Sequence, residues 1–141
     1  HWGRKIVLKG IQTIEDAKLS VQHGVDAIAL SNHGGRQLDD APNPIDLVQP
    51  VSNAVGGQVE LFCDGGIRRG SDIVKAISLG ADACMICRPF LYGLGAAGEK
   101  GVDWVLNFLK EGMHQTMALL GAKSLTDLHP DLIERRRKVR A

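Results

Sequence analysis

The sequence predicts an α/β fold in which helices cover a parallel sheet. Short runs rich in β-branched and apolar residues alternate four times with helix-like runs, a pattern typical of strand–helix–strand units. Each strand-like run also ends in charged, polar or glycine residues, and ligands bind at the carboxyl ends of parallel strands. A complete (β/α)8 barrel takes about 250 residues. The 141 residues therefore fit half of a barrel or a small open sheet, and the cluster at the end of every strand favours the half-barrel.

The order of the elements follows from local signals. Thr13 and Asn43 precede helix-like runs as N-caps, and Pro44 takes a first helical position. Gly10 is expected to end the first strand. Strands are expected at residues 5–9, 25–31, 59–63 and 83–86, and helices at residues 14–23, 44–55, 71–79, 90–98 and 102–120.

Composition narrows the function classes. The chain is 44% hydrophobic with a formal net charge of +1, so no general attraction to nucleic acid or an anionic membrane is implied. No run approaches the roughly 20 apolar residues of a membrane span, and no signal peptide is evident, so a cytoplasmic protein is expected. Cys63, Cys84 and Cys87 lack metal-ligand spacing, and we expect buried, reduced thiols and no metal site. The length is enough for one domain with one core, so a single domain is expected over residues 1–141.

The densest polar cluster, SNHGGRQLD, follows the second strand. His33 and Arg36 lie three residues apart in it, with two glycines between them that permit a tight turn. Arginine binds a carboxylate through two parallel hydrogen bonds, and histidine accepts a proton near neutral pH. The pair therefore indicates a substrate that carries both a carboxylate and an abstractable proton.

A second cluster, DGGIRRGSD, follows the third strand. Consecutive glycines free backbone N–H groups to face an anion, and a short helix begins just beyond them. Arg68 and Arg88 supply further charged donors. The loops after the last strands of such barrels often bind phosphate, so we expect a phosphate site here.

The segments LKGIQT, SNHGGRQLD, DGGIRRGSDIVKAISLGAD and RPFLYG, in this order, resemble the carboxyl-terminal half of the FMN-dependent α-hydroxy acid oxidase and dehydrogenase family. The resemblance implies a TIM barrel of which this chain holds strands five to eight, with an amino-terminal half missing. It also implies an FMN cofactor, oxidation of an L-2-hydroxy acid such as lactate or glycolate to the 2-oxo acid, and a homo-oligomer when complete.

The same resemblance implies a role for each motif residue. His33 matches the catalytic base, which also contacts the substrate, and Arg36 matches the carboxylate clamp. Lys9 matches the lysine beside flavin N1 and O2, and Ser31 a contact to the flavin ring. Cys87 stands where the family usually has glycine, although its backbone N–H could still bind phosphate. The ribityl and phosphate site is matched by Asp64, Gly65, Gly66, Arg68, Cys87 and Arg88.

Two other interpretations stay open at this point. Another phosphate-binding barrel, such as the inosinate dehydrogenase or type 2 isopentenyl isomerase groups, would share the DGGI turn but not SNHGGRQ. A non-catalytic half-barrel would serve only as a packing module. In the last long helix, Trp104, Phe108, Met113 and Met117 have helical spacing and are expected to be core or packing residues. The basic tail at residues 134–138 is expected to be a solvated helix end or a subunit contact.

Overall fold

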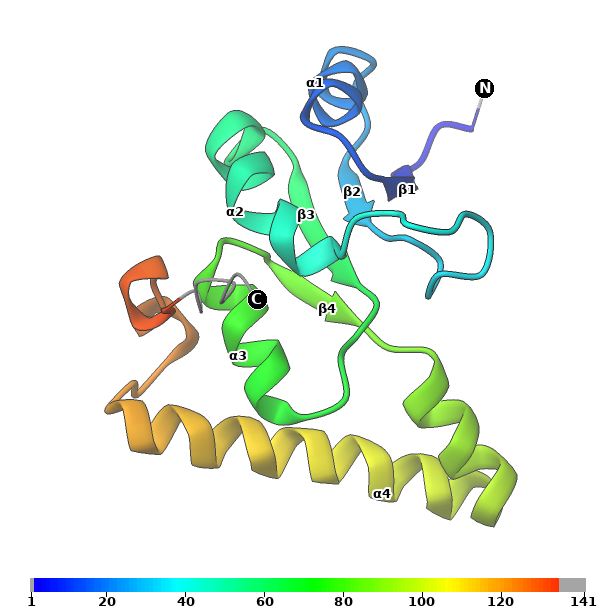
Figure 1. The fold of residues 1–141 in the computed structure, drawn as a ribbon, viewed down its shortest axis with the longest axis vertical. Coiled ribbons are helices and arrows are strands. Elements are labelled where there is room, and N and C mark those ends of the chain that lie inside the picture. The colour runs from blue at the N-terminus through cyan, green and yellow to red at the C-terminus, as the bar shows by residue number, and fades with distance from the viewer. Residues whose placement is uncertain (1, 135–141) are drawn as a thin grey trace, which may run out of the picture.

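A computed structural model describes residues 2–134 and shows one parallel sheet whose strands follow the order of the sequence. A helix follows each strand, as Figure 1 shows. An open doubly wound sheet would instead place later strands on both sides of the first, so the sequential order is that of half a barrel. The strands are β1 (Val7–Ile11), β2 (Ala27–Leu30), β3 (Glu60–Asp64) and β4 (Ala83–Met85), and the helices are α1 (Ile14–Gln22), α2 (Pro44–Val55), α3 (Gly70–Ser78) and α4 (Arg88–Leu120).

The core lies between the sheet and the helices on one of its faces. Alternate residues of β2 and β3 point toward these helices, as the period of two in a strand requires. The face of α2 that meets them carries three valines spaced by three or four residues, as in an amphipathic helix. The central buried residues are Ile28, Leu30, Leu61, Cys63, Val48, Val51 and Val55.

The first strand differs from the prediction at Gly10. This residue does not end the strand but lies within β1, with φ of 102°, and the pairing with β2 shifts between Lys9 and Ile11. Such a bulge bends a strand and redirects a side chain. Glycine is required because L side chains rarely adopt this φ.

The first two helices begin where the sequence predicts, and one capping detail differs. Thr13 Oγ1 accepts a hydrogen bond from the backbone N–H of Asp16 at 3.0 Å, so it caps α1 as predicted. Asn43 precedes α2 and Pro44 begins it, but the Asn43 side chain makes no capping hydrogen bond. Its amide instead lies 3.3 Å from Oδ2 of Asp46.

The last two predicted helices are the two arms of α4. Ala97 and Gly98 leave helical geometry, with φ of −152° and 59°, so the chain turns sharply between the arms. A Cβ on Gly101 would overlap the backbone of Gly93, and one on Gly70 would overlap the backbone of α4 at Met113. Glycine at these positions therefore lets the arms pack on each other and α3 pack on α4, which fixes the end of the sheet near β4.

Trp104 and Phe108 of α4 lie outside the core, so of the predicted core or packing role only packing applies to them. Trp104 and Phe108 are 66% and 47% exposed and stack on each other, with ring centroids 5.5 Å apart. The buried positions of this arm include Val105, which lies near Gly93 of the other arm, and Leu109, which lies near Gly70 of α3. Met117 is buried as predicted, and Met113 packs against it. Residues 135–138 of the basic tail lie outside the described residues.

The sheet is open at both edges within residues 2–134. β1 pairs only with β2, and β4 only with β3. Val7 and Leu8 at one edge are 51% and 42% exposed, and Met85 at the other is 37% exposed. A closed barrel has no such edges. Among the helices that the structure describes, none is long and apolar enough to cross a membrane.

Candidate functional site

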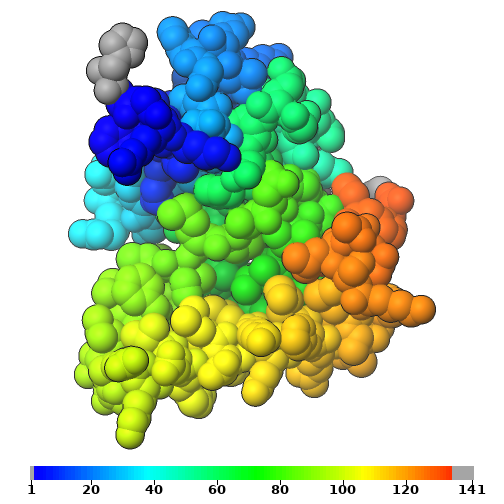
Figure 2. All heavy atoms as spheres, turned by 180° about the vertical axis from the view of Figure 1, so that it is seen from behind, coloured from blue at the N-terminus to red at the C-terminus, as the bar shows by residue number. Residues whose placement is uncertain are grey.

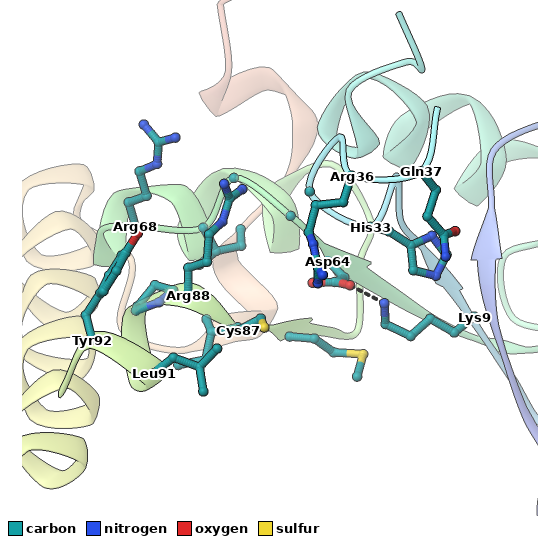
Figure 3. A pocket seen from close by; sticks show the side chains of 17 residues that line it. Lys9, His33, Arg36, Gln37, Asp64, Arg68, Cys87, Arg88, Leu91 and Tyr92 are labelled. Atoms are coloured by element: carbon teal, nitrogen blue, oxygen red, sulfur yellow. Dashed lines mark ion pairs between the residues drawn. The ribbon is translucent and has the colours of Figure 1, made fainter. Parts of the chain in front are cut away.

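A cavity of about 890 Å³ lies at the carboxyl ends of the four strands. It is lined from every βα junction, so the parallel sheet collects residues that are far apart in the sequence (Figure 3). All predicted site residues except Ser31 line it. The predicted members are Lys9, His33, Arg36, Asp64, Gly65, Gly66, Arg68, Cys87 and Arg88.

A buried hydroxyl connects three of the junctions. Ser31 is 1% exposed, and its Oγ donates to Asp64 Oδ2 at 2.8 Å. The same oxygen accepts from Lys9 Nζ at 3.0 Å and from the backbone N–H of His33 at 3.1 Å. Lys9 also forms an ion pair with Asp64, drawn as a dashed line in Figure 3. Ser31 therefore lies behind the cavity wall and orders the residues in front of it.

His33 stands on a turn of unusual backbone conformation. Its φ is 54°, and Gly34 and Gly35 follow with φ of 72° and 73°. The imidazole lies over Gly10, since a Cβ on that residue would be only 3.1 Å from His33 Cε1. Gly10 thus serves twice, in the bulge of β1 and in the space left for the ring.

The opposite end of the cavity is cationic. Arg68 and Arg88 lie there, whereas Lys9 and His33 lie at the other end, with Arg36 extending from its loop between them (Figure 3). Arg88 reaches the turn that carries His33, because a Cβ on Gly34 would be 3.1 Å from Arg88 Nη2. Figure 2 shows the two segments meeting at the edge of the molecule, with the segment after β2 in cyan and the start of α4 in yellow-green.

The glycine turn after β3 has two consecutive residues with positive φ. Gly65 and Gly66 have φ of 103° and 79°, and a Cβ on Gly66 would meet no atom within 4 Å. Cys87 occupies the position before the first turn of α4, and that turn begins with Arg88. Two backbone turns and two guanidinium groups therefore face one end of the cavity.

Sequence reasoning missed several residues of the cavity wall. Gln37 directly follows Arg36 in the same motif and was not assigned a role. Leu91 and Tyr92 come three and four residues after Arg88, which places them on the same side of α4 as that arginine. The helical spacing from Arg88 was the signal available for these two.

The three cysteines differ in exposure, and the prediction of buried thiols is wrong for Cys87, which is exposed and lines the cavity. Burial, with a smaller effect of Asp64, raises the pKa of the Cys63 thiol to about 11. Burial and, to a smaller extent, the neighbouring Cys63 raise the pKa of the Cys84 thiol to about 12. Both thiols are therefore protonated at neutral pH.

Residues 2–134 contain no group of three potential metal ligands.

Comparisons with known proteins identify the family of this chain. A sequence profile for FMN-dependent dehydrogenases matches residues 1–135. The chain is 50% identical over 129 residues to 2-hydroxyacid oxidase 2 of Mus musculus, and the match covers 92% of this chain and 36% of that protein. It is 51% identical over 129 residues to pre-mycofactocin synthase of Mycobacterium tuberculosis, covering 92% of this chain and 33% of that protein.

Solved structures give the same result for the fold. A crystal structure of mandelate oxidase with benzoyl-formic acid matches with a TM-score of 0.89 and 42% identity, over 92% of this chain and 39% of that one. A mandelate oxidase variant with a monooxide FMN adduct matches with a TM-score of 0.87 and 42% identity, over 91% of this chain and 41% of that one. The predicted partial TIM barrel is therefore confirmed.

The chain spans about a third of the length of the curated relatives it matches. The profile match favours the predicted family over the other phosphate-binding barrels, which had stayed open. From residue 1 to residue 135, this chain belongs to the FMN-dependent dehydrogenase family.

Proposed function

We propose that residues 1–141 are the carboxyl-terminal half of a barrel that oxidises an L-2-hydroxy acid to the 2-oxo acid. The observation that carries this proposal is one cavity with two chemically different ends. One end holds His33 with Arg36 nearby, which suits a substrate carboxylate and a proton to be removed. The other end holds Arg68 and Arg88 beside a glycine turn, which suits a phosphate.

The residues present fit FMN, the cofactor of the family. The cavity of about 890 Å³ lies within the usual range for ligand and cofactor pockets. Gly65 and Gly66 line it, with open space where a Cβ on Gly66 would lie, and Arg68 and Arg88 line it as candidate phosphate ligands. Bound FMN would accept the two electrons that the hydroxy acid loses.

The chain's own residues account for binding and proton transfer. The guanidinium group of Arg36 binds the substrate carboxylate through its planar pair of N–H donors. His33 accepts a proton from the substrate as the oxo acid forms. Lys9 is held by Asp64 and Ser31, and its ammonium group would stabilise the negative charge that a bound flavin gains on reduction.

A small substrate such as lactate or glycolate is our proposal within this class. Arg36 and His33 recognise only the carboxylate and the adjacent alcohol, which all 2-hydroxy acids share.

The open edges β1 and β4 suit an amino-terminal half-barrel as partner, since pairing there would close the sheet. We also propose a cytoplasmic homo-oligomer for the complete enzyme.

The test compares this chain alone with a complete barrel in which the amino-terminal half is joined to it, both with added FMN. The complete barrel should reduce its flavin when lactate or glycolate is added, and the chain alone should bind FMN weakly and not turn over. His33→Gln should slow flavin reduction by roughly 10²- to 10⁴-fold without loss of FMN.

His23→Gln is the matched control, because His23 is exposed at the end of α1 and does not line the cavity. Arg36→Lys should raise the Michaelis constant and lower turnover, since a point charge replaces the planar clamp. Flavin reduction by the His33 variant at the parent rate would rule out the proposed base.

A further inference from the structure

Asn32 lies between the end of β2 and the proposed base His33, and it has no part in the proposed reaction. We propose that Asn32 is a positioning residue that holds the His33 imidazole in place for proton transfer. The inference rests on the proposed role of His33. It concerns a side chain that does not line the cavity and would act only through its neighbour.

Three hydrogen bonds place Asn32 around the turn. Its side-chain Oδ1 accepts from the backbone N–H of Gly34 at 3.0 Å, and its carbonyl oxygen accepts from the N–H of Gly35 at 2.9 Å. These two bonds bracket His33 on both sides of its backbone. The Nδ2 group donates to the carbonyl of Pro42 at 3.3 Å, which ties the turn to the far end of the same loop.

The turn needs such support because its backbone conformation is unfavourable. His33 has φ of 54°, and left-handed conformations of residues other than glycine are unfavourable and persist only where the surroundings fix them. The hydrogen bond from Gly34 N–H to Asn32 Oδ1 closes a ring that mimics a backbone turn. An alanine at position 32 would leave the turn with the Ser31 and Gly35 contacts alone.

Asn32 also spaces the two ends of the site. A Cβ on Gly65 would lie 3.4 Å from Asn32 Oδ1 and 3.5 Å from Cγ of Pro44. Oδ1 of Asn32 therefore lies close both to the turn that carries the base and to the turn proposed to bind phosphate. We infer that it helps to set the position of His33 relative to the proposed phosphate site.

The experiment uses the complete FMN-loaded barrel and compares Asn32→Ala, Asn32→Ser and the parent. Asn53→Ala is the matched control, because Asn53 is exposed on α2. We expect Asn32→Ala to lower kcat by about 10- to 100-fold, since a misplacement of about 1 Å can cost 10²-fold. KM and FMN content should change less than about threefold. Serine keeps a shorter oxygen that can accept from the N–H two residues on, so Asn32→Ser should recover part of the loss.

A double-mutant cycle with His33→Gln decides whether Asn32 acts through the base. If it does, Asn32→Ala should slow flavin reduction further by less than about twofold once His33 is gone. A loss in the His33→Gln background as large as in the parent would overturn the inference, as would a kcat for Asn32→Ala equal to that of Asn53→Ala. Should Asn32→Ala fail to fold, the same cycle with Asn32→Ser gives the decision. Full activity of His33→Gln alone would instead defeat the proposed function.

Discussion

Three buried serines offer a graded test of how the site is held together. Ser31, Ser20 and Ser78 are 1%, 3% and 1% exposed, so replacing each by alanine removes one buried hydroxyl. They differ in partners. Ser31 Oγ makes three hydrogen bonds, two of them to Lys9 and Asp64, whereas Ser20 Oγ donates only to the carbonyl of Asp16 at 2.7 Å. Within residues 2–134, Ser78 Oγ has no partner.

The magnitudes follow from those partners. A neutral hydrogen bond contributes about 1 kcal/mol net and one to a charged group about 1.5–3 kcal/mol. Lys9 and Asp64 would keep each other after Ser31→Ala, so we expect the free energy of unfolding to fall by about 2–3 kcal/mol. Ser20→Ala should cost about 0.5 kcal/mol, because the better helix propensity of alanine offsets part of the lost bond. Ser78→Ala should stabilise by about 1 kcal/mol, since an unpaired buried hydroxyl is removed.

The assay is equilibrium urea denaturation of the three variants beside the parent, with midpoints compared at equal m-values. Ser20→Ala and Ser78→Ala serve as controls for each other, because both serines lie in helices and both substitutions gain the same helix propensity. A loss for Ser31→Ala no larger than that for Ser20→Ala would refute the argument that this hydroxyl organises the three junctions. A destabilised Ser78→Ala would show that its hydroxyl has a partner in solution.

Two further predictions concern the cationic end of the cavity and the thiols. Arg88→Ala should weaken FMN by about tenfold or more and riboflavin by much less, because only FMN carries a phosphate that can make a charge-assisted contact; equal losses in fluorescence titrations would contradict the phosphate assignment. At pH 8, a thiol reagent should modify the exposed Cys87 at least about tenfold faster than Cys63 and Cys84. Only the thiolate reacts, and burial raises the pKa of Cys63 to about 11 and that of Cys84 to about 12. The Cys87→Ser variant should lack the fast phase, and rapid modification of two thiols would count against the buried pair.

Much of the fold was predictable because its signals are local. The alternation of apolar runs and amphipathic runs, with glycine after each helix, gave the four units in order. Gly10 was misread for the same reason. A glycine after an apolar run usually indicates the end of a strand. Only the pairing of β1 with β2 shows that β1 continues past Gly10 through a bulge. Helical spacing placed Trp104 and Phe108 on one face of a helix, but it could not show that this face is largely exposed.

The site was predictable where a motif and its chemistry coincide. His33, Arg36 and the glycine turn line one cavity, as the order of strand ends implies. The hydrogen bonds of Ser31 were not predictable in this way. The flavin contact that the resemblance implied stays a prediction, and the hydroxyl is bonded to residues 22 and 33 positions away in sequence. Such bonds depend on how neighbouring strands align and leave no trace in the local sequence.

The net charge of +1 conceals a strong separation of charge along the strands. The cavity at the carboxyl ends is lined by Lys9, Arg36, Arg68 and Arg88 against one carboxylate, Asp64, which gives a local charge of +3.

A smaller hollow at the amino ends is lined by Asp26, Glu60 and Asp82. Two of these acids have structural partners, since Asp26 accepts from the N–H of Ile6 and Asp82 from the N–H of Leu61, each at 2.7 Å. In each βα unit, the strand leads into a helix whose amino end faces the cavity side, and helix amino ends carry partial positive charge. Side chains and backbone therefore give the carboxyl end the same sign. A phosphate and a carboxylate can both be attracted there although the chain as a whole is almost neutral, and that attraction should weaken as salt rises.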